Sequence, residues 1–208
     1  MTSVPHLNIS MLLPKSATLT PPSTPPGCPW YEVARDKQAQ RETQLAKRQQ
    51  WRLAGSDVPS PLLKDVSHLM TSKLSSLERL IVESDATTIV RQIRERSWTA
   101  VEVLTAFCKV AVVAQDLTNC LTEIFIDQGM ARAKELDDHL ERTGQVVGPL
   151  HGLPVSIKDH ILIRGLDTST GYIAWANETV AEKDAVVVVS FPSRVSHESR
   201  SCDLIFLQ

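Results

Sequence analysis

Features that mark membrane, metal-bound and disulfide-stabilised proteins are missing from this sequence. No apolar run approaches the ~18 residues that a membrane-spanning helix needs. The four cysteines lie far apart without a CxxC pair, which argues against a structural zinc site and a disulfide framework. The N-terminus has neither the apolar stretch of a signal peptide nor the arginines of a transit peptide. We therefore expect reduced thiols, a cytoplasmic location, no bound metal and no membrane association.

A charge excess of either sign is also missing. The 22 Lys and Arg residues oppose 24 Asp and Glu residues, for a formal net charge of −2. This balance argues against a general nucleic-acid binder. Hydrophobic residues make up 42% of the 208 positions and charged residues 22%, both ordinary for a globular protein. The chain can therefore bury a core of one domain, or at most two.

Prolines are concentrated at one end of the chain. The first 29 residues hold seven of the twelve prolines, separated mostly by Ser and Thr. Such a segment cannot build a helix or bury a core, so we expect residues 1–28 to be a disordered tail. A polyproline site for a partner is the alternative, although basic residues do not flank the prolines of the PPSTPP stretch.

Helical patterns dominate the first two thirds of the sequence. Trp30–Trp51 is rich in strong helix formers, and its basic residues favour a solvated helix face over a nucleic-acid surface. A second helix is predicted at Asp85–Arg96. Thr99 and Glu102 form a capping-box pattern that opens a helix running to about Gln115. Its apolar face includes Val101, Leu104, Cys108 and Val112, and we expect Cys108 to be a core residue rather than a nucleophile.

A strand-like pattern follows these helices. Leu121–Asp127 is rich in β-branched and aromatic residues, and Gln128–Arg142 returns to helical spacing with Gly144 as its terminator. Helices followed by a strand–helix unit favour an α/β fold.

The segment with most chemical potential lies between Gly144 and Gly171, which holds five of the eight glycines. It contains GPLHGLPVSIKD, followed by a short strand predicted at 161–163. Ser156 and Lys158 would point to the opposite side of a strand from Val155 and Ile157.

A lysine at the carboxyl end of a strand, beside a Gly- and Pro-rich loop, lies where α/β folds place ligands. Burial disfavours an ammonium, so a buried Lys158 could accept a proton from a serine hydroxyl. The residues alone also allow a surface lysine paired with Asp159.

The stretch GPLHGLPVSIKDHILIRGLDTSTGYIAWANETVAEKDAVVV closely resembles the amidase signature family. Its most specific motif is Gly-x-Pro-x-x-x-Lys-Asp, at residues 152–159, followed by DTSTGY. Upstream, TAVEVLTAFCKVAVVAQDLTNCLTEIFIDQGMARAKELDDHLERTG and CPWYEVARDKQAQR resemble the fungal acetamidase-type general amidases. The resemblance covers about residues 29–189.

This resemblance implies an α/β fold, namely the N-terminal part of the amidase signature fold, a mixed sheet flanked by helices. It implies hydrolysis of small-molecule carboxylic acid amides to acid and ammonia by a Ser–cis-Ser–Lys triad, with no cofactor. The matching catalytic lysine is Lys158. In the family it accepts, through a bridging serine, the proton of a nucleophilic serine, and backbone N–H groups stabilise the oxyanion.

The sequence departs from the family after residue 189. The triad serines belong to a Gly-Gly-Ser-Ser-Gly-Gly-like segment that is not found here, so neither is assigned to a residue. We interpret the chain as truncated before this nucleophile segment, with residues 29–189 as a partial amidase domain and 190–208 as a non-family tail. The Val189-Ser190 dipeptide, which an in-frame intron donor encodes, suggests intron retention or a frameshifted gene model.

A truncated sheet would expose backbone groups and apolar faces, because its strands would lack their central neighbours. We therefore expect poor solubility of the chain alone and no amidase turnover. Two other functions stay open. One is a non-catalytic remnant or interaction protein; the other is a relative of the amidotransferase A subunit, disfavoured because DTSTGYIAW resembles the general amidases. The oligomeric state is left open.

Side chains around the motif carry further expectations. His151 could line a pocket mouth, but His151 and His160 without a third ligand do not predict a metal site. Asp159 would orient Lys158 or cap a turn. Tyr172 and Trp175 would pack within their loop, or contact an aromatic or acyl group of a substrate.

Overall fold

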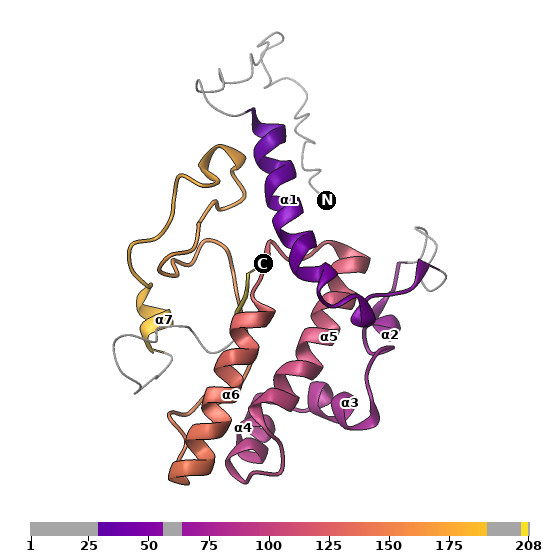
Figure 1. Ribbon diagram of the computed structural model, residues 1–208, viewed down its shortest axis with the longest axis vertical. Helices are drawn as coiled ribbons and strands as arrows, with labels where there is room; N and C mark the ends of the chain where they lie inside the picture. Colours follow the sequence, from indigo (N-terminus) through magenta and orange to yellow (C-terminus); the bar gives the residue numbers. More distant parts are fainter. Residues whose placement is uncertain (1–28, 56–63, 191–204, 208) are drawn as a thin grey trace, which may run out of the picture.

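The computed structural model describes residues 29–55, 64–190 and 205–207 (Figure 1). The predicted tail at 1–28 lies outside this range, as does most of the predicted tail at 190–208. The elements in chain order are α1 (Trp30–Ala46), η2 (Gln49–Trp51), α2 (Ser67–Met70), α3 (Ser76–Glu83), α4 (Ala86–Arg94), α5 (Ala100–Thr118), β1 (Glu123–Ile124), α6 (Ile126–Thr143), β2 (Val155–Ile157), η4 (Ile173–Trp175), α7 (Val186–Ser190) and β3 (Ile205–Leu207). Over these ranges, no helix combines the length and the apolar character that crossing a membrane requires.

The helix predicted from Trp30 is present as α1 and continues into η2. Arg35 and Lys47 are exposed, as expected for a solvated helix face, whereas the basic residues after α1 also bind acidic groups of other elements. Arg48 contacts Asp127 at 2.7 Å, and Arg52 contacts Asp116 at 2.8 Å. These ion pairs fix α1 and η2 to the ends of α5 and α6.

Side-chain caps set where the central helices begin. The predicted capping box of Thr99 and Glu102 is formed at α5, and a second one, which the sequence analysis missed, opens α3 at Ser75 and Glu78. Asp137 of α6 also accepts the N–H groups of the first two residues of α5, at 2.7 and 3.0 Å. The start of α5 is therefore held both by its own cap and by a neighbouring helix.

The core surrounds α5, which packs against α3 on one side and α6 on the other (Figure 1). Leu104, Cys108 and Val112 are buried as predicted, whereas Val101 is only partly buried. Burial raises the pKa of the Cys108 thiol to about 12, so this cysteine is a core residue and not a nucleophile.

The strand predicted at Leu121–Asp127 is shortened to the two residues of β1. The reason is local: the Gly129 N–H bonds to the Phe125 carbonyl at 2.9 Å, so the chain is already helical by Ile126. Gly144 ends α6 in the left-handed conformation, with a φ of 70°, as its position after the helical pattern predicts.

A small mixed sheet joins the two halves of the described chain in the order β1-β3-β2. β3 runs antiparallel to β1 and parallel to β2, with Ser156 opposite Phe206. We expected β1 and β2 to lack a central neighbour, but β3, from the predicted non-family tail, lies between them. The strand predicted at 161–163 is wrong, because the Ile161 N–H turns back to the Lys158 carbonyl at 2.9 Å.

Candidate functional site

The Gly-x-Pro-x-x-x-Lys-Asp motif begins with a tight turn against the helices. Gly152 has a φ of +75°, and a Cβ atom there would lie 2.8 Å from the Ala100 Cβ and 2.9 Å from the Ile93 Cδ1. The backbone thus approaches α4 and α5 as closely as only glycine allows. Leu153, the next residue, packs against the same helices, and β2 begins two residues after it.

Lys158 follows the last residue of β2. The strand alternates as predicted, with Ile157 buried and Ser156 exposed, so Lys158 leaves the sheet on the side away from the core. Its side chain is exposed, and the part of the chain described here gives its amine no ion pair. The burial that we expected around this amine is therefore not supplied by these residues.

The residue after the lysine fastens a second loop to the motif. Asp159 accepts a hydrogen bond from the Ser169 hydroxyl at 3.2 Å. Ser169 is the first serine after Lys158 in the sequence. Asp159 thus holds the 167–180 loop beside the lysine, a role that sequence reasoning had left between orienting Lys158 and capping a turn.

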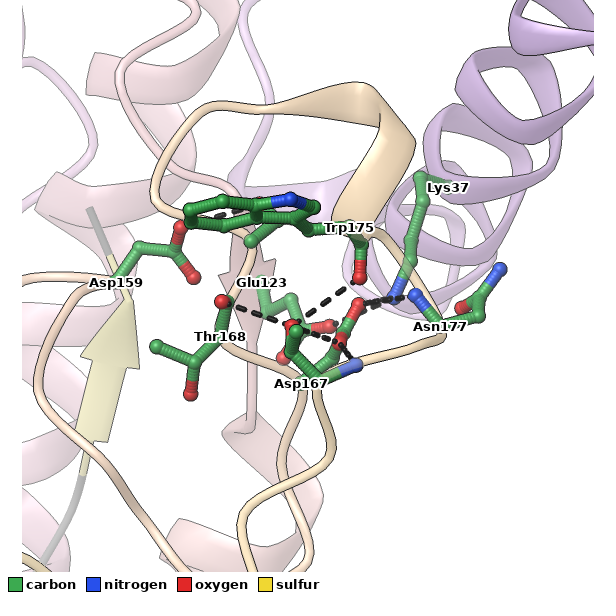
Figure 2. A network of polar contacts seen from close by, with 9 residues as sticks. Lys37, Glu123, Asp159, Asp167, Thr168, Trp175 and Asn177 are labelled. Carbon is green, nitrogen blue, oxygen red and sulfur yellow. Dashed lines mark hydrogen bonds and ion pairs between the residues drawn. The ribbon is translucent and has the colours of Figure 1, made fainter. Parts of the chain in front are cut away.

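The 167–180 loop is held at its other side by a lysine of α1 (Figure 2). The Lys37 amine lies 3.2 Å from a carboxylate oxygen of Asp167 and 3.5 Å from one of Glu123 at β1. Burial raises the pKa of Glu123, against the opposing charge of Lys37. Burial acts in the same direction on Asp167, but its hydrogen bonds and Lys37 outweigh it and hold the pKa of Asp167 below its usual value.

Asp167 in turn organises the backbone of the loop. Its carboxylate accepts the Asn177 N–H at 2.6 Å and lies 3.1 Å from the Thr179 hydroxyl. That hydroxyl is also 2.9 Å from the Thr168 carbonyl and 3.1 Å from the Trp175 carbonyl (Figure 2). A continuous set of polar contacts therefore connects α1 to the 167–180 loop, which is also hydrogen-bonded to Asp159.

A cavity of about 290 Å³ lies beside this network, between α1, β1 and the loop. Lys37, Glu123 and Asp167 are among its lining residues, and Lys158 is not. The cavity and the candidate lysine are thus separate features of the described chain.

His151 does not line a pocket mouth, because its side chain is only 1% exposed. Its Nδ1 accepts the Val147 N–H at 3.2 Å, and its buried Nε2 has no hydrogen-bond partner among the described residues. Burial, with the positive charges of His139 and Arg132, lowers the pKa of His151 to about 4. Within the described ranges, no three His, Cys, Asp or Glu side chains group as a metal site.

Tyr172 and Trp175 pack on each other, with ring centroids 4.8 Å apart. Both remain exposed, at 60% and 48%, so the packing expected within their loop covers only part of each ring.

Sequence reasoning missed Lys37 because the pattern of α1 gives no sign of which basic residue meets a carboxylate from a distant segment.

Comparison with known proteins finds a matching family, similar sequences and a similar fold. The Amidase family model matches residues 102–191. The acetamidase of Emericella nidulans is 39% identical over 151 residues, 72% of this chain and 26% of the relative. Amidase 2 of Gibberella moniliformis is 38% identical over 160 residues, 77% of this chain and 27% of the relative.

Among solved structures, a fatty acid amide hydrolase superimposes with a TM-score of 0.70 at 23% identity, over 86% of this chain and 30% of that one. The described fold is therefore part of the α/β amidase fold. By sequence the chain matches the amidase family over part of its length, which confirms the resemblance. The chain spans only 20% to 31% of the length of such curated relatives.

Proposed function

We propose that residues 29–189 are the lysine-bearing part of a cytoplasmic amide hydrolase, with Lys158 as its catalytic lysine. The observation that carries the proposal is the family motif at 152–159, folded so that Lys158 directly follows β2 and points away from the core. The substrate would be a small-molecule amide, cleaved to a carboxylic acid and ammonia. The name of the Emericella relative makes acetamide the first substrate to test.

In this proposal the Lys158 amine accepts the proton that leaves a nucleophilic serine through a bridging serine. An amine accepts a proton only in its neutral form, which is favoured when the side chain is removed from water. Lys158 is exposed in this chain. Both the two serines and the residues that would exclude water from the Lys158 amine would therefore come from amidase sequence outside these 208 residues. The Asp159–Ser169 contact would keep the neighbouring loop in place around it.

The exposure of Lys158 also favours a second candidate function. If Lys158 stays exposed and no serines are supplied, the chain would be the non-catalytic remnant or interaction protein that the sequence leaves open. The two candidates differ in one measurable property, which is whether the lysine supports turnover once the missing amidase sequence is supplied.

The experiment supplies that sequence in the same polypeptide. Residues 29–189 are joined to the part of the Emericella nidulans acetamidase that follows its matching region, and ammonia release from acetamide is measured. We expect release by this chimera and none by the 208-residue chain. A folded chimera that releases no ammonia would leave the interaction protein as the better account.

A further inference from the structure

A groove on helix α4 carries positive charge that no acidic lining residue balances. It has a volume of about 350 Å³ and lies between α4 and the turn at 148–150. Two arginines are among its lining residues, and no Asp or Glu is. Most of the others are apolar, and the main lining residues are Ala86, Val90, Arg91, Arg94, Pro149 and Leu150.

The apolar part of the groove is formed by both of its walls. Val90 is buried on α4, and Leu150 is half-buried in the turn. Ala86 lies four residues before Val90, on the same face of α4, and its short side chain takes up little of the space. An apolar ligand group placed here would leave water, which favours binding.

The charged part of the groove comes from α4 alone. Arg91 and Arg94 are three residues apart in the last turns of this helix, so they are neighbours on one face. Both side chains are exposed. Within the described ranges, neither guanidinium group has a hydrogen bond or an ion pair with another side chain. Their hydrogen-bond donors are therefore available to a ligand.

The acidic residues at the two ends of α4 do not neutralise these arginines. Asp85 caps the helix and accepts the Thr88 N–H at 2.7 Å. This hydrogen bond lowers the pKa of Asp85 most, and Arg91 contributes least among the groups that act on it. Glu95, at the other end, is exposed and does not line the groove. The groove thus keeps most of its positive charge.

The two walls of the groove are held together by the core. The turn is closed by the Leu153 N–H, which bonds to the Leu150 carbonyl at 3.0 Å. Ile93 of α4 is fully buried and lies against Gly152, where a Cβ atom would be only 2.9 Å from the Ile93 Cδ1. A ligand would therefore bind a site that is already formed, without the cost of ordering it.

We propose that this groove binds a small-molecule carboxylate with an apolar body, such as an arylacetate. Two neighbouring guanidinium groups match the two oxygens of a carboxylate, and the apolar body would lie on Val90 and Leu150. The inference does not rest on the proposed function, because binding needs neither Lys158 nor turnover. The alternative is that both arginines only stabilise the C-terminal end of α4 through its helix dipole.

The test is a titration of the ¹⁵N-labelled 208-residue chain with phenylacetate, followed by NMR of the backbone amides. Acetate keeps the charge without the ring, and 2-phenylethanol keeps the ring without the charge. Arg91→Gln and Arg94→Gln remove the positive charges, whereas Ala86→Leu fills the groove and keeps them. Arg35→Gln is the matched control at an exposed arginine of α1, which lies away from α4 (Figure 1). Circular dichroism checks that each variant folds.

We expect saturable shifts of amides in α4 and at 148–153, with a dissociation constant of about 1 mM, the scale for a ligand of about ten heavy atoms. Arg91→Gln, Arg94→Gln and Ala86→Leu should each weaken binding by about fivefold or more, and Arg35→Gln should leave it unchanged. Acetate and 2-phenylethanol should each bind more weakly than phenylacetate by about the same factor.

Three results would overturn the inference. The first is the absence of saturable shifts in this region, or equal binding of 2-phenylethanol. The second is parent-like binding in Arg91→Gln and Arg94→Gln together with lower stability, which would leave these arginines only the dipole role. The third is loss of binding in Lys158→Ala, which would place the carboxylate at the lysine motif. An inactive amidase chimera removes the proposed function and leaves this inference standing.

Discussion

At the scale of single residues, the first glycine of the lysine motif has a packing role that can be measured. Gly152 combines a φ of +75° with two carbon atoms within 3 Å of where a Cβ would lie. For Gly152→Ala, the left-handed strain and the overpacking together predict a loss of about 2–4 kcal/mol in the free energy of unfolding. Urea denaturation followed by circular dichroism measures it.

Gly165 offers the matched control. Its φ is +82°, but nothing lies within 4 Å of a Cβ placed there. Gly165→Ala should therefore cost only the backbone strain, about 1 kcal/mol. Equal losses for the two variants would mean that contact with α4 and α5 is not what requires glycine at position 152.

His151 predicts how stability depends on pH. Burial lowers its pKa to about 4, so the folded chain prefers the neutral imidazole, whereas the unfolded chain binds a proton below about pH 6.5. The free energy of unfolding should therefore fall by about 3 kcal/mol through His151 as the pH drops from 6.5 to 4. Below pH 4, His151 should cause no further change.

The variant His151→Gln removes the titrating group while keeping an acceptor for the Val147 N–H. We expect the urea midpoint to change less between pH 6.5 and 4 in this variant than in the parent chain. His160→Gln makes the same substitution at an exposed histidine and serves as the matched control. An unchanged slope in His151→Gln would show that other groups cause the acid sensitivity.

At the scale of elements, α6 fixes the start of α5 through one carboxylate. Asp137 accepts the N–H groups of Ala100 and Val101, which have no partner within their own helix. Asp137→Asn should lower the free energy of unfolding by about 1–2 kcal/mol, because these charge-assisted bonds are lost or weakened. Asp138→Asn is the control at an exposed neighbour, and a thermal melt giving equal losses would refute the assignment.

The polar contacts of Lys37 predict a local change in loop mobility. Lys37→Met keeps the apolar stem but removes the cation between Asp167 and Glu123, whose carboxylates then repel each other. We expect faster hydrogen exchange of amides 167–180 and a loss of about 1–2 kcal/mol. Lys47→Met breaks a more exposed pair, with Asp127, and should leave exchange in this loop unchanged.

At the scale of the whole molecule, local signals predicted the helices α1, α4, α5 and α6, missed α2, α3 and α7, and predicted the sheet poorly. The capping box at Thr99 and the terminator at Gly144 are encoded within a few residues. The start of α5 and the end of α6 could therefore be predicted. The pairing of β3 with both β1 and β2 joins segments far apart in the chain, and nothing in their composition specifies it.

Part of the candidate site could likewise be predicted from the local sequence, and part of it could not. Lys158 and the direction of its side chain follow from the motif and from the alternation of β2. The contact of Lys37 with Asp167 could not be predicted, because it depends on where α1 lies relative to a loop about 130 residues later. The exposure of the Lys158 side chain likewise depends on what the rest of the fold covers.

The central claim is that Lys158 is the catalytic lysine of an amide hydrolase, and one comparison tests it most directly. In the chimera with the Emericella nidulans segment, ammonia release from acetamide is compared between Lys158→Ala and Lys183→Ala, an exposed lysine of the 167–189 region. The account predicts at least an approximately 100-fold loss for Lys158→Ala, the scale of a lost proton acceptor, and parent-like turnover for Lys183→Ala. Parent-like turnover in Lys158→Ala would contradict it.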